Sequence, residues 1–158
     1  REERKAGIVS DLETALSIDP DNLDVLIELV DQQIRDDNTQ VAEEYLAHAR
    51  QVDPKDPRVY VQMARIERSR NDGEAELATI EAGLEVIPTD RQLISLLLNA
   101  QLVQKQPEKA KKTIERMRTL NYPPEWIAFS EAKVLCLDEQ WRQPLDRNRC
   151  YESRRQQY

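Results

Sequence analysis

Glycine is scarce in this sequence, with only 3 residues among 158. All-β proteins need many tight turns and nucleotide-binding loops need clustered glycines, so the scarcity disfavours both classes. Cysteine is also rare, and Cys136 and Cys150 are too few to hold a small domain together by disulfides. Such cysteine usage is compatible with a reducing cytoplasm but leaves the compartment open. The sequence has no apolar run long enough to cross a membrane and no basic-then-apolar leader.

Acidic residues outnumber basic residues by 30 to 23, which gives a formal net charge of −7. A net negative chain is repelled by nucleic acid and by anionic membranes, so direct nucleic-acid binding is not expected. The charge is distributed unevenly: residues 1–56 carry 6 basic and 15 acidic groups, net −9, whereas residues 91–124 carry 7 and 2, net +5. Because the chain begins with Arg1 inside a helical pattern, we expect a fragment of a longer protein.

Proline marks the ends of helical segments at a nearly constant spacing. Pro20, Pro54 and Pro88 lie 34 residues apart, and Pro123 follows 35 residues later. Proline cannot continue a helix because it lacks the amide hydrogen and clashes with the preceding turn. Between these positions, apolar residues recur at the three- and four-residue spacing of a helix, interrupted by a polar break. Each period is therefore predicted to hold two antiparallel helices.

The sequence predicts an all-α protein, since no segment has the two-residue alternation of a half-buried strand. Asp56-Pro57 is a favourable helix start, and Thr89 followed by Gln92 has the spacing of a capping box. We expect eight helices, near residues 2–19, 23–36, 39–52, 57–70, 73–87, 90–105, 107–120 and 124–139. A weaker ninth helix is expected near 144–155. One helix pair cannot bury its apolar face alone, so stacking into an α-solenoid is favoured over a closed bundle.

The period and the order of large and small residues resemble the tetratricopeptide repeat (TPR). In that family the first helix carries bulky and then small residues, and the second carries small residues around a large one before the proline. The clearest copy has Leu26, Leu29, Val30, Ala42, Leu46, Ala49 and Pro54 at these places. In the next copy Glu76 stands where the first small residue of the second helix is expected, beside Ala75. The family's usual first-helix tryptophan, glycine and tyrosine are mostly absent.

The resemblance covers roughly residues 2–140 and implies a right-handed superhelix of stacked helix pairs. We expect a single array over residues 1–158, made of the second half of a repeat at 2–22, repeats at 23–56, 57–90 and 91–123, and a partial or capping repeat at 124–158. An alternative interpretation comes from Tyr60 to Glu67, which faintly resemble the first helix of the half-a-TPR repeats of RNA-processing scaffolds.

The resemblance also implies a concave groove, lined by the first helices, that binds an extended peptide or a partner helix. Residues one turn apart on these helices, away from the packing stripe, should face the groove: Asp24, Ile27, Asp31, Ile34, Arg58, Val61, Arg65, Arg68, Gln92, Ser95, Asn99 and Leu102. The candidate contacts among them are Ile27, Asp31, Arg58, Val61, Arg65, Arg68, Ser95 and Asn99. The arginines could hold a carboxylate by two hydrogen bonds, Asn99 could bind peptide backbone, and Ile27 with Val61 could form an apolar floor. Alternatively, Asp31 and Arg65 lie one repeat apart and would pair with each other.

The groove positions of this sequence can be compared with those of family members that bind the C-terminal tails of chaperones. These members use lysine and asparagine on one first helix, asparagine on the next, and lysine with arginine on the third. The equivalent places in this sequence hold Ile27 with Asp31, then Arg65, then Ser95 with Asn99. Because the cationic clamp is absent, chaperone tails are not the expected ligands.

Two further surfaces are predicted outside the groove. Lys109, Lys112 and Arg116 share one face of a predicted second helix. This face is either solvated, or an edge for an acidic partner, or a contact between copies through the acidic first repeats. Without interleaved aromatic residues it is not predicted to bind nucleic acid. The helix from Trp126 to Leu137 is apolar nearly all round, which implies burial on more than one side or docking of further repeats.

Catalytic and metal-binding patterns are absent from the sequence. His48 is the only histidine, the cysteines lack CxxC spacing, and no GxSxG, P-loop or HExxH motif occurs. We therefore expect no enzyme activity, no metal and no cofactor. The leading hypothesis is a protein–protein interaction scaffold that binds a peptide or partner segment in the groove. The alternatives are an accessory docking array of a larger enzyme or of a secretion or assembly machine, and the RNA-processing scaffold.

Overall fold

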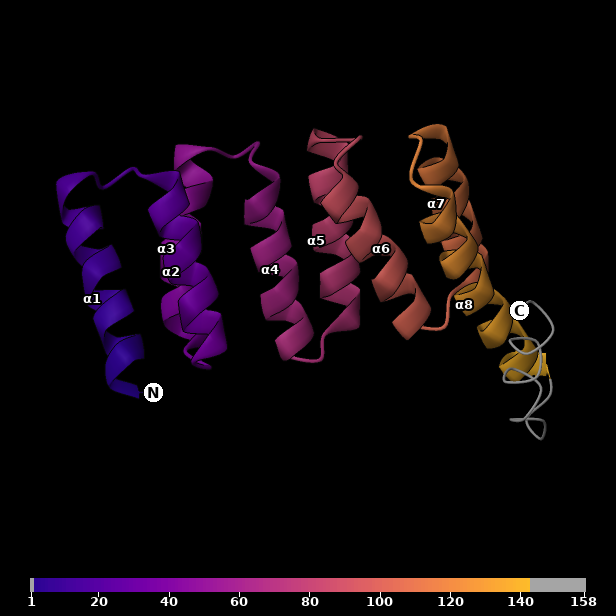
Figure 1. Cartoon of the computed structure of the whole chain (residues 1–158), viewed down its shortest axis with the longest axis horizontal. Helices are drawn as coiled ribbons and strands as arrows, with labels where there is room; N and C mark the ends of the chain where they lie inside the picture. Colours follow the sequence, from indigo (N-terminus) through magenta and orange to yellow (C-terminus); the bar gives the residue numbers. More distant parts are fainter. Residues whose placement is uncertain (1, 143–158) are drawn as a thin grey trace. The chain divides into compact units, whose positions relative to one another are not determined.

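The computed structural model describes residues 2–142 of the chain, and the side chains of residues 7–137. All the regular secondary structure in this range is helical (Figure 1). The eight helices are α1 Glu2–Ile18, α2 Leu23–Arg35, α3 Thr39–Val52, α4 Pro57–Ser69, α5 Gly73–Val86, α6 Arg91–Val103, α7 Pro107–Thr119 and α8 Pro124–Arg142. The all-α prediction is confirmed for the described residues. The ninth helix expected near 144–155 and Cys150 lie outside them.

The chain divides into two compact units, Arg1–Leu93 and Ile94–Tyr158. The boundary falls near the start of α6, so the first unit holds α1 to α5 and the second holds most of α6 with α7 and α8. In the first unit each helix packs against the next one, and α2 also contacts α4. Contact between these alternate helices is expected when helix pairs stack side by side. In the second unit α7 packs against α8.

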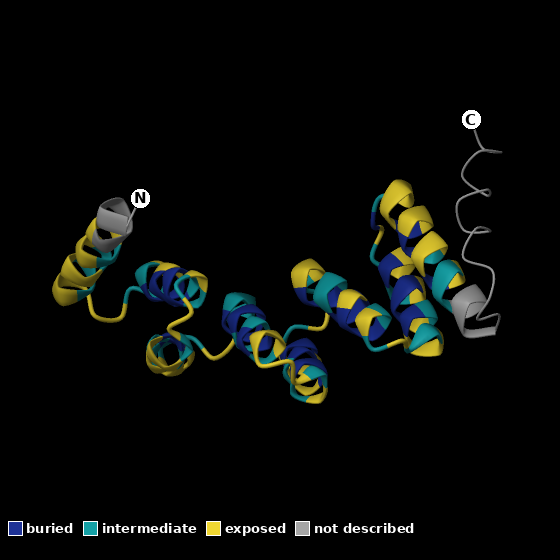
Figure 2. Ribbon diagram, turned by 90° about the horizontal axis from the view of Figure 1, so that it is seen from below, coloured by how far each residue is buried: buried dark blue, intermediate teal, exposed yellow. Residues whose placement is uncertain are grey.

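Buried residues of α2, α3 and α4 form a core cluster in the first unit. Figure 2 shows helices divided lengthwise into buried and exposed sides. The core cluster around α2 and α3 consists of Leu26, Ile27, Val30, Ala42, Leu46, Ala49, Val59 and Ile66. The small side chains of Ala42 and Ala49 let α3 approach α2, while the larger residues fill the remaining space. The predicted alternation of large and small residues thus corresponds to the observed packing.

The residues that precede the first helices also follow the 34-residue period. Asn22, Asp56 and Asp90 precede α2, α4 and α6, and their side chains accept a backbone N–H of the helix at 3.1, 2.8 and 2.7 Å. These bonds satisfy amide groups that have no partner within the helix. The capping box predicted at Thr89 is wrong by one residue. Because α6 begins at Arg91, the carboxylate of Asp90 occupies the capping position instead.

Four helices end at a non-glycine residue with left-handed backbone. Asp37, Asn71, Lys105 and Asn121 have φ between 54° and 62° and follow α2, α4, α6 and α7. In each case the next residue donates its N–H to a carbonyl five residues back, at 2.8 to 3.1 Å. This is the Schellman arrangement, which satisfies carbonyl groups at the helix end and reverses the chain. The first three of these residues are again 34 residues apart.

Helix α8 buries only one side within the described residues. Ile127 and Val134 are buried, whereas Trp126 and Phe129 are 56% and 59% exposed. The ammonium group of Lys133 lies 4.6 Å from the centre of the Phe129 ring, a cation–π contact that covers part of it. Burial of this helix on more than one side is therefore not observed in the part of the chain described. Docking of further repeats there stays a prediction.

Candidate functional site

A stripe of polar side chains follows α2 and continues on α4. Residues three and four positions apart lie on one face of a helix, and α2 contacts α4, so the two stripes adjoin. We call the following seven residues the α2–α4 polar face: Asp24, Glu28, Asp31, Arg35, Arg58, Gln62 and Arg65. Each of its α4 members lies 34 residues after an α2 member. The face therefore joins equivalent positions of two successive helix pairs.

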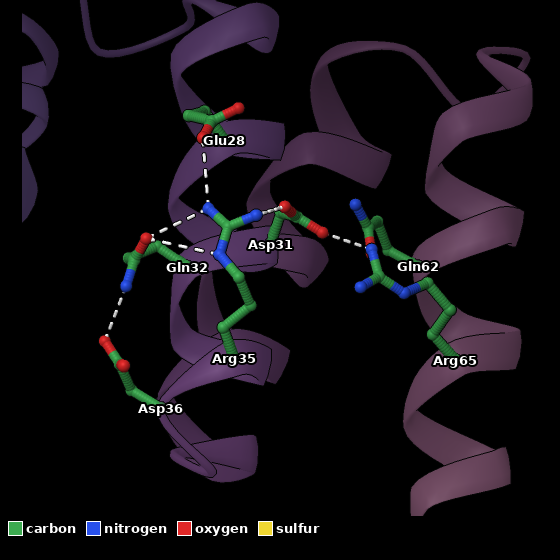
Figure 3. A network of polar contacts seen from close by, with 7 residues as sticks. All are labelled: Glu28, Asp31, Gln32, Arg35, Asp36, Gln62 and Arg65. Carbon is green, nitrogen blue, oxygen red and sulfur yellow. Dashed lines mark hydrogen bonds and ion pairs between the residues drawn. The ribbon is translucent and has the colours of Figure 1, made fainter.

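Asp31 lies between two arginines at the centre of this face (Figure 3). Nη1 of Arg35 donates to one carboxylate oxygen and Nη1 of Arg65 donates to the other. Burial of this half-buried side chain raises its pKa, but the hydrogen bond from Arg65 and the charges of Arg65 and Arg35 outweigh that effect. The pKa of Asp31 is therefore lowered. The predicted pairing of Asp31 with Arg65 across one repeat is confirmed.

Arg35 connects Asp31 to further polar groups of α2. Its Nη2 donates to Oε1 of Glu28 at 3.2 Å and to Oε1 of Gln32 at 2.9 Å. Nε2 of the buried Gln32 donates to Oδ2 of Asp36 at 2.7 Å (Figure 3). Nε of Arg35 also donates to Gln32, at 3.3 Å. Each guanidinium nitrogen of Arg35 therefore has a partner within the same stretch of chain.

Arg58 is held by two acids at the start of α4. Its Nη1 donates to Oδ1 of Asp24 at 2.6 Å, and its Nε and Nη2 donate to the Asp56 carboxylate at 2.8 to 3.1 Å. Hydrogen bonding from Arg58 outweighs burial and lowers the pKa of Asp56. The same bonds with Asp56 and Asp24 raise the pKa of Arg58. All three guanidinium nitrogens of Arg58 are thus engaged by the chain itself.

Arg65 differs from these two arginines because part of its guanidinium is unused. Its Nη1 donates to Asp31 and to Oε1 of Gln62, the latter at 3.0 Å. Its Nε and Nη2 have no hydrogen-bond partner in the described part of the chain, and the side chain is 37% exposed. Adjacent N–H groups of this kind form a planar fork that matches a carboxylate. Arg65 therefore keeps donors available to a ligand.

Three other predicted site residues of the first unit have packing roles. Nε of Arg68 donates to Oε1 of Glu76 on α5 at 2.8 Å, so this arginine is directed toward the second helix of its pair. Ile27 and Val61 are buried, and little of either side chain is accessible. They do not form an open apolar floor.

The remaining predicted residues, Ser95 and Asn99, lie on α6 in the second unit. Asn99 is exposed and Ser95 is half-buried. Of the eight predicted residues, the structure brings Asp31, Arg58 and Arg65 together on one polar face.

Glu28, Arg35 and Gln62 of the polar face were missing from the predicted groove residues, whereas Asp24 was expected there. Asp24 pairs with Arg58 exactly as the register of the repeats requires, since the two lie 34 residues apart. Glu28 and Gln62 are also 34 residues apart, so adding one repeat length to each acidic position of α2 would have identified Gln62. Arg35 pairs within its own helix, with Glu28 and Asp31 at spacings of seven and four residues.

The chemistry available to this face is hydrogen bonding and charge pairing. Among the described residues, no three His, Cys, Asp or Glu side chains are placed to hold a metal ion. No helix in the described range is both long enough and apolar enough to cross a membrane. The face presents exposed carboxylates beside the free donors of Arg65, an arrangement suited to binding a polar chain.

Comparison with known families agrees with the repeat pattern. Residues 6–66 match a family model described as a tetratricopeptide repeat. The matched span runs from α1 into α4 and contains the whole α2–α4 polar face. No curated protein matches the chain.

Proposed function

We propose that the chain, of which residues 6–66 match a tetratricopeptide-repeat model, is a protein-interaction scaffold that binds a peptide or partner segment along the α2–α4 polar face. Repeats of this family generally mediate protein–protein interaction. In this proposal the chain holds its partner and catalyses no reaction of its own.

The observation that carries the proposal is the free edge of Arg65. Its Nε and Nη2 have no partner in the described part of the chain, while its Nη1 is fixed by Asp31 and Gln62. A guanidinium that is already fixed in place loses less conformational entropy when it binds a ligand. Arg65 is therefore suited to accept a backbone carbonyl or a carboxylate from a partner segment.

The neighbouring acids provide acceptors beside this donor. The side chain of Asp24 is 82% exposed, and that of Glu28 is 55% exposed, although both form ion pairs. An extended polypeptide presents N–H and carbonyl groups together, so it can engage both the acids and the arginine. Ile27 and Val61 contribute by packing α2 and α4 in this register.

Equivalent positions on α6 are separate candidate contacts, which belong to the second unit. Ser95 and Asn99 lie 34 residues after Val61 and Arg65, respectively. The exposed amide of Asn99 offers both a donor and an acceptor to a peptide backbone. We include these two residues as candidate contacts in the second unit.

The test is to select binding peptides from a displayed random library with the full chain and then measure their affinity for variants. Arg65→Ala removes the free fork and should weaken the selected peptides by roughly 10- to 100-fold, the effect of losing a charge-assisted hydrogen bond. Asp24→Ala should weaken them by a smaller factor, because this carboxylate is largely solvated.

Arg70→Ala is the matched control for this experiment. Arg70 follows the same helix and is exposed, but it pairs with Glu43 on α3 at 2.8 Å. This variant should bind the peptides as tightly as the parent chain. The proposal is wrong if the selected peptides bind Arg65→Ala and the parent equally well while circular dichroism shows both to be folded.

A further inference from the structure

Helix α7 separates its charges onto two edges. Ala110, Thr113, Ile114 and Met117 form its buried side. On one edge, Glu108 pairs with Lys111 at 2.8 Å. On the same edge, Glu115 pairs with Arg118 at 3.3 Å, and Arg118 also contacts Glu131 of α8. The two acids of α7 are therefore committed to this edge.

The opposite edge of α7 contains only basic charged residues. Lys109, Lys112 and Arg116 lie three and four residues apart, which places them on one side of the helix. Lys109 and Lys112 are both exposed, and neither has an ion-pair partner in the described part of the chain. Glu108 stands four residues before Lys112, but its carboxylate pairs with Lys111. We call Lys109, Lys112 and Arg116 the α7 basic edge.

Lys109 and Lys112 differ from five arginines of the first unit. Arg35, Arg58, Arg65, Arg68 and Arg70 each pair with an acid of the same unit. Lys109 and Lys112 have no such partner among the described residues, although the chain as a whole carries an excess of acids. Lys109 and Lys112 thus place two positive charges where the described part of the chain supplies no ion-pair partner.

We infer that the α7 basic edge binds a short acidic protein segment. Lys109 and Arg116 are separated by seven residues, or about 10 Å along a helix. Alternate residues of an extended strand are about 7 Å apart, so two or three acidic side chains in such a segment can reach this edge together. The occupant is therefore a peptide stretch with closely spaced Asp or Glu residues.

A protein segment suits this edge better than a long polyanion. The net charge of −7 opposes association with nucleic acid or an anionic membrane, and that repulsion extends over about 8 Å at physiological salt. A short peptide meets mainly the local charge, which is +5 for residues 91–124. Helix α7 also contains no Phe, Tyr or Trp on which nucleic-acid bases could stack.

The test is fluorescence anisotropy with the full chain and a labelled peptide of alternating Glu and Ser. The Lys109→Gln/Lys112→Gln variant should weaken binding by about fivefold at low salt, the combined effect of two exposed ion pairs. Lys111→Gln is the matched control, since it changes the same charge on the paired edge, and it should have a clearly smaller effect. The double variant should cause the same loss when it is made in an Arg65→Ala background, which separates this edge from the carboxylate-binding fork of the proposed function.

Four results would overturn the inference. The first is no binding of the Glu peptide at low salt, or equal binding of a peptide in which Gln replaces Glu. The second is an equal loss with Lys111→Gln, which would indicate a non-specific charge effect. The third is tighter binding of single-stranded RNA or of phosphatidylserine vesicles than of the peptide. The fourth is salt-sensitive self-association in sedimentation that the double variant abolishes, which would assign the edge to a second copy of this chain.

Discussion

Glu76 carries a carboxylate into the contact between α4 and α5, where it is only 4% exposed. The equivalent places one repeat earlier and one repeat later hold Ala42 and Ala110, which are fully buried. Nε and Nη2 of Arg68 both donate to Oε1 of Glu76. A buried carboxylate is costly unless it is paired, so Arg68 has a structural role and is a poor probe of ligand binding.

Removing the side chain of Arg68 should therefore lower the stability more than removing that of Glu76, the acid with which it pairs. We expect Arg68→Ala to lower the free energy of unfolding by about 1–3 kcal/mol, because Glu76 is left buried without its partner. Glu76→Ala restores the small residue of the neighbouring repeats and should stay within about 1 kcal/mol of the parent. The double variant should match Glu76→Ala in urea unfolding followed by circular dichroism. Additive losses in the double variant would contradict this role.

Gly83 on α5 and Tyr60 on α4 are a second pair of residues, and their side-chain sizes are complementary. The equivalent places one repeat earlier hold Ala49 and Leu26, so a larger residue on the first helix accompanies a smaller one on the second. A Cβ atom at Gly83 would lie 2.8 Å from Cγ and 2.9 Å from Cβ of Tyr60. Since Cβ of Tyr60 is fixed to its backbone, relief would require α4 and α5 to move apart.

Alanine should lower the stability of the chain at Gly83 and raise it at Gly7. Gly83→Ala should lower stability by about 1–3 kcal/mol through overpacking, despite the better helix propensity of alanine. Gly7→Ala, on α1, meets no atom within 4 Å and should raise stability by up to about 1 kcal/mol. Thermal unfolding of both variants gives the comparison. An increase of similar size at both positions would show that α4 and α5 separate easily.

At the scale of elements, the turns between helices depend on residues that tolerate left-handed backbone unequally. Asn71 and Asp37 belong to the types most often found there, whereas Lys105 does not. Lys105 nevertheless occupies the equivalent position in the third helix pair, with φ of 55°. The turn between α6 and α7 is therefore the most strained of the three.

Glycine at this turn should stabilise the chain. We expect Lys105→Gly to raise the free energy of unfolding by about 1 kcal/mol, because glycine adopts positive φ without steric cost. Asn71→Gly should give a smaller gain, since asparagine already tolerates this conformation. Urea midpoints of the two variants measure the difference. If Asn71→Gly gains as much as Lys105→Gly, strain at the lysine is not the cause.

Helix positions were largely predictable from the sequence, while the turn conformations were not. Pro57, Pro107 and Pro124 each stand at the first residue of a helix, where proline is favoured, and those three starts were predicted to the residue. Thr89 was mistaken for a cap because the capping-box spacing does not distinguish it from the adjacent Asp90. Left-handed residues such as Lys105 escape prediction, because only glycine signals that conformation strongly.

At the scale of the whole molecule, the 34-residue period organises both the fold and the polar face. Pairing of Asp31 with Arg65 was predictable because both lie at one register of successive repeats. The contact of Arg68 with Glu76 was not, since it lies within one helix pair and depends on how the intervening turn is closed. Ion pairs were therefore predictable from the sequence where they follow the period, whereas the binding role of these residues stays a prediction.

Acidification should lower the stability of the folded chain by protonating the carboxylates of the polar face. The pKa of Asp31 is lowered in the folded chain, so its contribution to stability is present above the unfolded value of about 3.9 and is lost as pH falls through the lower folded value. We expect the urea concentration at the midpoint of unfolding to decrease when the pH is lowered below about 4.

Asp31→Asn should be less stable than the parent at neutral pH but should lose less stability on acidification, because its side chain has no proton to bind. Asp11→Asn, which removes an exposed acid without an ion pair in the described range, should keep the parent's dependence. Equal acid sensitivity of Asp31→Asn and the parent would assign the loss to other carboxylates.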